Sequence, residues 1–146
     1  MSDLWGFKDA KELEKNTRDM PDSILKEQIA LLSDKTNYAL YGKPVFMKIT
    51  NSEEIDYDLA TLFNIIVPKL DNYAKTILIM YSQPEEEYPV AISIGSSYED
   101  DCEDFHPQYI CNNTEEFITA ISEILSSNDI LHIIGVLYAK ANMLDG

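Results

Sequence analysis

Glycine and cysteine are scarce in this chain, and the motifs that depend on them are missing. Only five of the 146 residues are glycine, and two are cysteine. The sequence has no G-x-G-x-x-G, P-loop, G-x-S-x-G or H-E-x-x-H motif, so nothing in it marks a nucleotide-binding protein, a hydrolase or a metalloprotease. The two cysteines, Cys102 and Cys111, predict reduced thiols in a cytoplasmic protein rather than a disulfide framework.

Long apolar runs are missing as well. No stretch approaches the roughly 20 apolar residues of a membrane span, and the first residues show no basic region followed by an apolar one, as a secretion signal would. We therefore expect a cytoplasmic protein without membrane contact. A length of 146 residues with 45% hydrophobic residues predicts a single domain over 1–146 with its own core. Residues 1–20 are expected to form a loosely docked N-terminal arm, in which 8–19 is either a solvated helix or a loose segment, with Leu4, Trp5 and Phe7 against the body.

Basic residues almost disappear from the second half of the chain. The net charge is −15, and residues 76–146 hold 13 acidic residues with Lys140 as their only lysine or arginine, a net of −12. Direct binding to nucleic acid is disfavoured because phosphate contacts need Lys and Arg. The charge favours a basic protein partner, such as a nuclease or a nucleic-acid-binding protein. A role of this charge in solubility alone stays open.

Hydrophobic periodicity predicts one helix before the acidic half and two at its end. Residues 21–33 repeat apolar side chains at helical spacing, with Pro21 suited to a first turn. Asn113 and Glu116 resemble a capping box, and Asn128 is expected to cap the last helix. The side chains expected to point inward from the helix after Asn113 are Phe117, Ile118, Ile121, Ile124 and Leu125.

The segments between these helices are expected to form strands, because 59–68 is rich in β-branched and aromatic residues and 88–95 alternates in period two. Strand material at 38–49 is expected to break at 42–44, and further strands are expected at 59–68, 73–81 and 88–95, with a short one at 108–111. The short connections favour an antiparallel meander. The predicted fold class is α+β, with an N-terminal helix, a meander of about four strands and two C-terminal helices.

Candidate partner-binding residues lie in two acidic runs. They are Glu85, Glu86, Glu87, Tyr88, Glu99, Asp100, Asp101, Glu103 and Asp104. The second run leads to His106 and, with Cys102 and Cys111, offers possible metal ligands. Its spacing fits neither a calcium loop nor a zinc finger, so we expect a solvated loop, although metal binding by 99–104 stays open. No catalytic residue, cofactor site or metal site is predicted.

Tyrosine is abundant, with nine residues, and six of them fall in or beside the predicted strands. These are Tyr38, Tyr41, Tyr57, Tyr73, Tyr81 and Tyr88. Sheet packing is the simpler interpretation, and an aromatic binding face is the alternative. The last predicted helix has an unusually broad apolar face, so a homodimer through this helix is a further alternative.

The order helix, meander, Tyr88-Pro89, His106-Pro107, Cys111 and helices resembles ubiquitin-conjugating enzymes and the related RWD domains over about residues 21–140. The resemblance implies that Cys111 takes the place of the catalytic cysteine. Gln108 stands where the enzymes carry Asn, so it implies an inactive domain. A looser similarity, in size, charge and composition, is to small acidic bacterial immunity and inhibitor proteins, which neutralise basic nucleases or nucleic-acid-binding proteins.

The leading hypothesis is a non-enzymatic acidic module that binds a basic protein partner as an inhibitor, immunity or anti-defence factor. The alternatives are an inactive ubiquitin-conjugating-like domain and a homo-oligomeric structural domain. Neighbouring carboxylates disfavour a thiolate, so we expect Cys111 to be unreactive.

Overall fold

The structure of the chain is a computed structural model, and it describes residues 2–49, 56–95 and 107–143. The helices and strands follow the order that the sequence predicts. They are α1 (Ala10–Asn16), α2 (Pro21–Lys35), β1 (Tyr41–Lys48), β2 (Leu59–Val67), the 3-10 turn η1 (Pro68–Leu70), β3 (Tyr73–Gln83), β4 (Glu86–Ile94), β5 (Tyr109–Cys111), α3 (Thr114–Leu125) and α4 (Asn128–Met143).

The five strands form one antiparallel sheet in the order β1-β2-β3-β4-β5. Each strand pairs with the next along the chain, as the short connections require. The fold class, α+β with an antiparallel meander and two C-terminal helices, is confirmed. The fifth strand, β5, is the short segment expected near residues 108–111.

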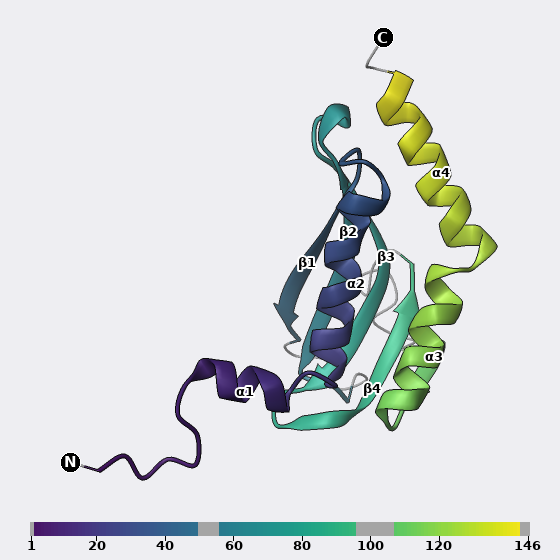
Figure 1. Cartoon of the computed structure of the whole chain (residues 1–146). Coiled ribbons are helices and arrows are strands. Elements are labelled where there is room, and N and C mark those ends of the chain that lie inside the picture. Colours follow the sequence, from purple (N-terminus) through teal and green to yellow (C-terminus); the bar gives the residue numbers. More distant parts are fainter. Residues whose placement is uncertain (1, 50–55, 96–106, 144–146) are drawn as a thin grey trace.

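The main core lies between one face of the sheet and the helices α2, α3 and α4, which lie on that same face (Figure 1). Alternation along the strands directs Leu78 and Met80 of β3 into this core, and Ile79 and Tyr81 to the opposite face. Helix α2 contributes Leu25, Ile29 and Leu32, all buried. The opposite face has a smaller buried cluster of Ala60, Ile79, Tyr81 and Ala91.

Two expectations for the last two helices were wrong, one on a buried residue of α3 and one on the cap of α4. The side chain of Asn113 accepts a hydrogen bond from the backbone N–H of Glu116 at 2.9 Å, which fixes the start of α3 as predicted. From that start, the inward stripe is Phe117, Ala120, Ile121 and Ile124, so the expectation for Ile118 was wrong; it is 51% exposed. Asn128 is not the cap of α4, because the Ser127 hydroxyl accepts the N–H of Ile130 at 3.3 Å.

Strand β1 is continuous through Gly42 and Pro44, so the predicted break at 42–44 was wrong. Within the described residues β1 pairs only with β2, and an edge strand tolerates a proline because one side of its backbone needs no donor. Gly42 is needed for a different reason. A Cβ at this position would lie 2.4 Å from the backbone oxygen of Ile29, so only glycine lets α2 pack this closely.

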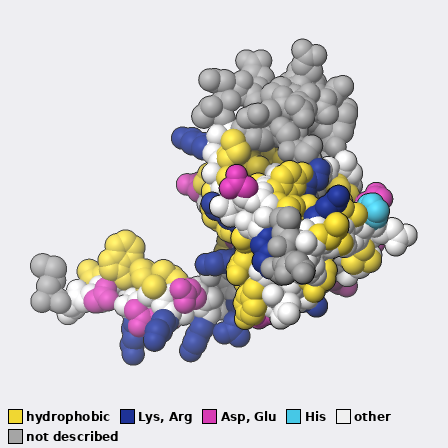
Figure 2. Space-filling model, turned by 90° about the horizontal axis from the view of Figure 1, so that it is seen from above, with side chains coloured by type: hydrophobic (Ala, Val, Ile, Leu, Met, Phe, Trp, Pro, Cys, Tyr) yellow, Lys and Arg dark blue, Asp and Glu magenta, His cyan; other side chains and the backbone are white. Residues whose placement is uncertain are grey.

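The N-terminal arm does not dock its apolar residues on the body, contrary to expectation. Leu4 is 92% exposed and Trp5 77% exposed, and α1 buries no residue. Figure 2 shows the arm standing away from the body, with a hydrophobic cluster toward its end. Two hydrogen bonds hold the arm to the body at residues 17–19: Ser23 donates to the carbonyl of Thr17 at 2.9 Å, and Thr114 donates to that of Asp19 at 3.2 Å.

None of the helices described here is by itself both long and apolar enough to cross a membrane. Helices α3 and α4, bent by 51° to each other, meet that criterion of length and composition only as a pair.

Candidate functional site

Four carboxylates from two distant chain segments line one hollow beside the β3–β4 hairpin. Asp56 and Asp58 precede β2, and Glu85 and Glu86 belong to the hairpin. We call this site the acidic hollow; its volume is about 620 Å³, and its other lining residues are Tyr57, Gln83, Pro84 and Pro89. All four carboxylate side chains are exposed, and no Lys, Arg or His is among the lining residues that the structure describes.

The meander explains why these acids meet. Gln83 pairs with Glu86 across a turn of only two residues, Pro84 and Glu85, which directs the glutamates out at the end of the sheet. The antiparallel register places Leu59 of β2 opposite Ser82 of β3, so the residues just before β2 lie beside the hairpin. The side-chain amide of Gln83 donates to the backbone carbonyl of Asp56 and ties the two segments together.

The sequence-based candidates divide into three groups. Glu85 and Glu86 line the acidic hollow, and Glu87 is exposed next to it in β4. Tyr88 was a candidate as well, but it is half-buried against the main core and donates its hydroxyl to that of Thr114 at 2.9 Å. Tyr88 therefore holds β4 against α3 and is not part of the acidic surface. The candidates Glu99, Asp100, Asp101, Glu103 and Asp104 lie outside the described residues.

Asp56 and Asp58 were missed as candidates. The signal that could have found them is positional: in an antiparallel meander, the residues before one strand lie next to the turn that follows its neighbour. Asp56-Tyr57-Asp58 comes just before β2, and Pro84-Glu85-Glu86 follows β3. Counting acidic residues along the chain cannot show that these two segments are neighbours, because 27 positions separate Asp56 from Gln83.

A second acidic groove runs between β5 and α3, with a volume of about 530 Å³. Glu115, Glu116 and Glu123 line it, with Ile110 59% exposed at its edge. The Tyr109 hydroxyl donates to the carboxylate of Glu123 at 3.1 Å. Burial first, and then this carboxylate, raise the pKa of Tyr109 above its ordinary value.

Cys111 lies at the floor of this groove, and it is only 2% exposed. Burial raises the pKa of its thiol, and the nearby carboxylate of Glu116 raises it further. The thiolate is the nucleophilic form of cysteine, so both effects oppose nucleophilic chemistry at neutral pH.

The tyrosines of the meander do not form one face. Tyr81 is buried and Tyr57 contacts it ring to ring at 6.4 Å, which is sheet packing. Tyr38 and Tyr41 are exposed at the β1 edge, with ring centroids 6.5 Å apart. Tyr73 is exposed as well. Among the described residues, no three Cys, His, Asp or Glu side chains are grouped so as to hold a metal ion.

No protein-family model matches the chain, and neither does any curated protein or solved structure.

Proposed function

We propose that this protein is a non-enzymatic acidic module that binds a basic protein partner and acts as an inhibitor, immunity or anti-defence factor. The observation that carries the proposal is the acidic hollow, where Asp56, Asp58, Glu85 and Glu86 line one concave surface. A lysine or arginine side chain of a partner is the natural complement of such a surface, because carboxylates accept charge-assisted hydrogen bonds from both.

The charge distribution supports the same proposal. The groove between β5 and α3 adds Glu115, Glu116 and Glu123, and residues 76–146 carry a net charge of −12. Charges of one sign over a surface attract a partner of opposite sign and raise the rate of encounter. A nuclease or nucleic-acid-binding protein has the basic surface that this field would select.

Two alternatives remain predictions: an inactive ubiquitin-conjugating-like domain and a homo-oligomeric structural domain. A ubiquitin-conjugating-like domain fits the order of helices and strands, but the burial and raised thiol pKa of Cys111 weigh against thioester chemistry. Tyr88 and Pro89, which the resemblance includes, lie inside β4, and the Tyr88 hydroxyl donates a hydrogen bond to Thr114 of α3. For a homo-oligomer through α4, the relevant side chains are Leu131 and Val136, which are 54% and 40% exposed.

A pair of variants with equal charge tests the proposal. The first, D56N/D58N/E85Q/E86Q, neutralises the acidic hollow. The control, E14Q/D19N/E27Q/D129N, neutralises four exposed carboxylates on or beside the helices. Wild-type chain and both variants are immobilised, and proteins retained from a lysate of the source cells are identified.

We expect a basic protein that the wild-type chain and the control retain and the hollow variant loses. With that protein purified, its association rate should fall steeply as salt rises, because salt screens exposed charges beyond about 8 Å at physiological ionic strength. Equal binding to both variants, or an association rate that ignores salt, would reject the acidic hollow as the binding surface.

A further inference from the structure

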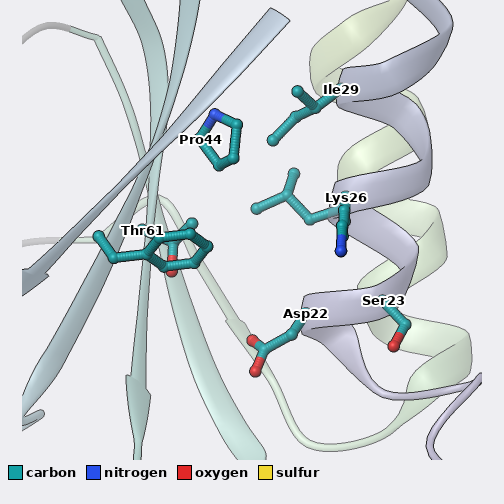
Figure 3. A pocket seen from close by; sticks show the side chains of 8 residues that line it. Asp22, Ser23, Lys26, Ile29, Pro44 and Thr61 are labelled. Atoms are coloured by element: carbon teal, nitrogen blue, oxygen red, sulfur yellow. The ribbon is translucent and has the colours of Figure 1, made fainter. Parts of the chain in front are cut away.

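A smaller hollow opens between α2 and the edge strand β1. We call it the α2–β1 hollow; it is lined by Asp22, Ser23, Leu25, Lys26, Ile29, Pro44, Phe46 and Thr61. Figure 3 shows Ile29 and Pro44 facing each other across the gap, with Asp22 pointing from the start of α2 toward the strands. Helix and strand touch at Gly42 and Ile29, and they diverge toward Phe46, which leaves this space open.

The size and lining of the hollow suit one aromatic ring. Its volume is about 130 Å³, and a cavity of about 150 Å³ lined by Leu, Ile and Phe side chains accepts a benzene molecule. Leu25, Ile29, Pro44 and Phe46 provide comparable apolar walls. Phe46 is 72% exposed, so a large part of this apolar surface faces solvent.

The chain itself presents an aromatic side chain without such a site. Trp5 is the only tryptophan in the sequence, and it is 77% exposed. Among the described residues, its ring contacts that of Phe7 in the same arm, with centroids 5.9 Å apart. An exposed tryptophan leaves a large apolar area in water, which binding in an apolar hollow would remove.

Charge at the mouth of the hollow complements charge on the arm. The side chain of Asp22 is exposed as a whole, but the protein around its carboxyl removes water and raises its pKa. A nearby cation would stabilise that carboxylate, and Lys8 lies three residues after Trp5. Lys26 lines the same rim, and Glu14 of α1 carries an exposed carboxylate of opposite charge.

We propose that the N-terminal arm docks on a second copy of this chain, with the Trp5 ring in the α2–β1 hollow and Lys8 beside Asp22. Two copies related by a two-fold axis would exchange arms, so each contact would occur twice. This inference concerns self-association and does not depend on the proposed basic partner.

The geometry of the arm favours a second copy over the arm's own body. Helix α1 separates Trp5 from the attachment at residues 17–19 by about 10 Å of rigid helix, and the side chain of Asp9 caps that helix by accepting the N–H of Glu12 at 3.1 Å. Figure 1 shows α1 starting at the foot of α2 and the arm pointing outward from the body, to the lower left of the view.

Fluorescence of the single tryptophan tests the proposal directly. The F46A chain keeps its arm but loses one wall of the hollow, and the W5A chain has an intact hollow and no tryptophan. Both positions are exposed, so folding should survive, which thermal melts would verify. Adding excess W5A chain to dilute F46A chain should shift the Trp5 emission to shorter wavelength, because Trp5 enters the hollow of the other molecule.

Two further variant chains, each added in excess to the F46A chain, complete the test. The W5A/F46A chain has a damaged hollow and should bind the arm about tenfold or more weakly. The W5A/Y41A chain should act like W5A, since Tyr41 lies on the same strand but faces the other side of the sheet. No emission shift on adding W5A, or an equal shift with W5A/F46A, would overturn the proposal. A concentration-independent, buried-type emission of the wild-type chain would also overturn it, because the arm would then dock on its own body.

Discussion

A Cβ atom at Gly42 would lie 2.4 Å from the backbone oxygen of Ile29 and 2.8 Å from its Cγ2 atom. This contact sets the distance between α2 and β1 at one end, and the α2–β1 hollow opens at the other. Helix and strand thus meet at a residue that has no side chain, on the edge of a sheet that Pro44 also occupies.

The first prediction follows from this contact. Gly42→Ala should lower the free energy of unfolding by about 1–3 kcal/mol, the usual cost of forcing extra atoms into a packed region. Urea denaturation of the wild-type chain and the variant measures the difference. A variant as stable as the wild type would show that α2 can move away from β1 freely.

Gly135 provides the opposite prediction. It lies in α4, and a Cβ there would meet nothing within 4 Å. Alanine loses less backbone entropy than glycine on forming a helix, so Gly135→Ala should raise the free energy of unfolding by about 0.5–1 kcal/mol. The same urea experiment tests it, and a destabilised variant would mean that this side of α4 packs against another molecule.

Asn113 gives a third prediction, on the start of α3. Its side chain accepts the N–H of Glu116 at 2.9 Å, and the Glu116 carboxylate accepts the N–H of Asn112 at 2.8 Å. Asn113→Ala removes the first bond and should cost about 1 kcal/mol of stability. Asn112→Ala is the matched control, because its backbone N–H remains and surface changes usually stay within about 0.5 kcal/mol. Equal losses in both variants would contradict the capping role.

The sequence predicts this fold well where local patterns decide it. Runs of β-branched and aromatic residues locate β2 and β3, alternation locates β4, and helical spacing with Pro21 and Asn113 locates α2 and α3. Local rules are wrong at Gly42, because a glycine two residues before a proline suggests a turn, while the packing of α2 requires a glycine inside a strand. They are wrong at Ile118 because an apolar residue one position off the stripe still fits a helical pattern.

The candidate site was less predictable than the fold. Glu85 and Glu86 were found because they are consecutive, whereas Asp56 and Asp58 join them only through the register of β2 with β3. Tyr88 follows the same acidic run, yet strand alternation turns it into the core. Exposure of Trp5 was missed because an apolar side chain near a terminus is ordinarily expected to pack on the body.

The reactivity of Cys111 is a fourth prediction, and it bears on the conjugating-enzyme alternative. The thiol is buried and its pKa is raised, so alkylation requires the protein to open first. In a C102S chain, which leaves Cys111 as the only thiol, iodoacetamide near neutral pH should react more than about tenfold more slowly than in the same chain unfolded in urea. Rapid alkylation of the folded chain would instead support an activated cysteine.

The fifth prediction concerns stability at alkaline pH. The ordinary pKa of the Cys111 thiol is 9.0, and burial followed by the Glu116 carboxylate raises it in the folded chain. The folded state therefore holds the thiol proton at a pH where the unfolded state has lost it, and this contribution to stability is complete below pH 9 and disappears as the pH rises through the folded-state pKa. Tyr57, Tyr88 and Tyr109 also have raised pKa values, above an ordinary 10.0, so they act in the same direction at higher pH.

Free energies of unfolding from urea melts between about pH 8 and about pH 10 should fall for the wild-type chain. In Cys111→Ala the fall should be shallower over this range, although the variant starts from a lower stability because it loses a buried sulfur. Identical slopes in the two chains would show that the Cys111 thiol titrates alike in the folded and unfolded states.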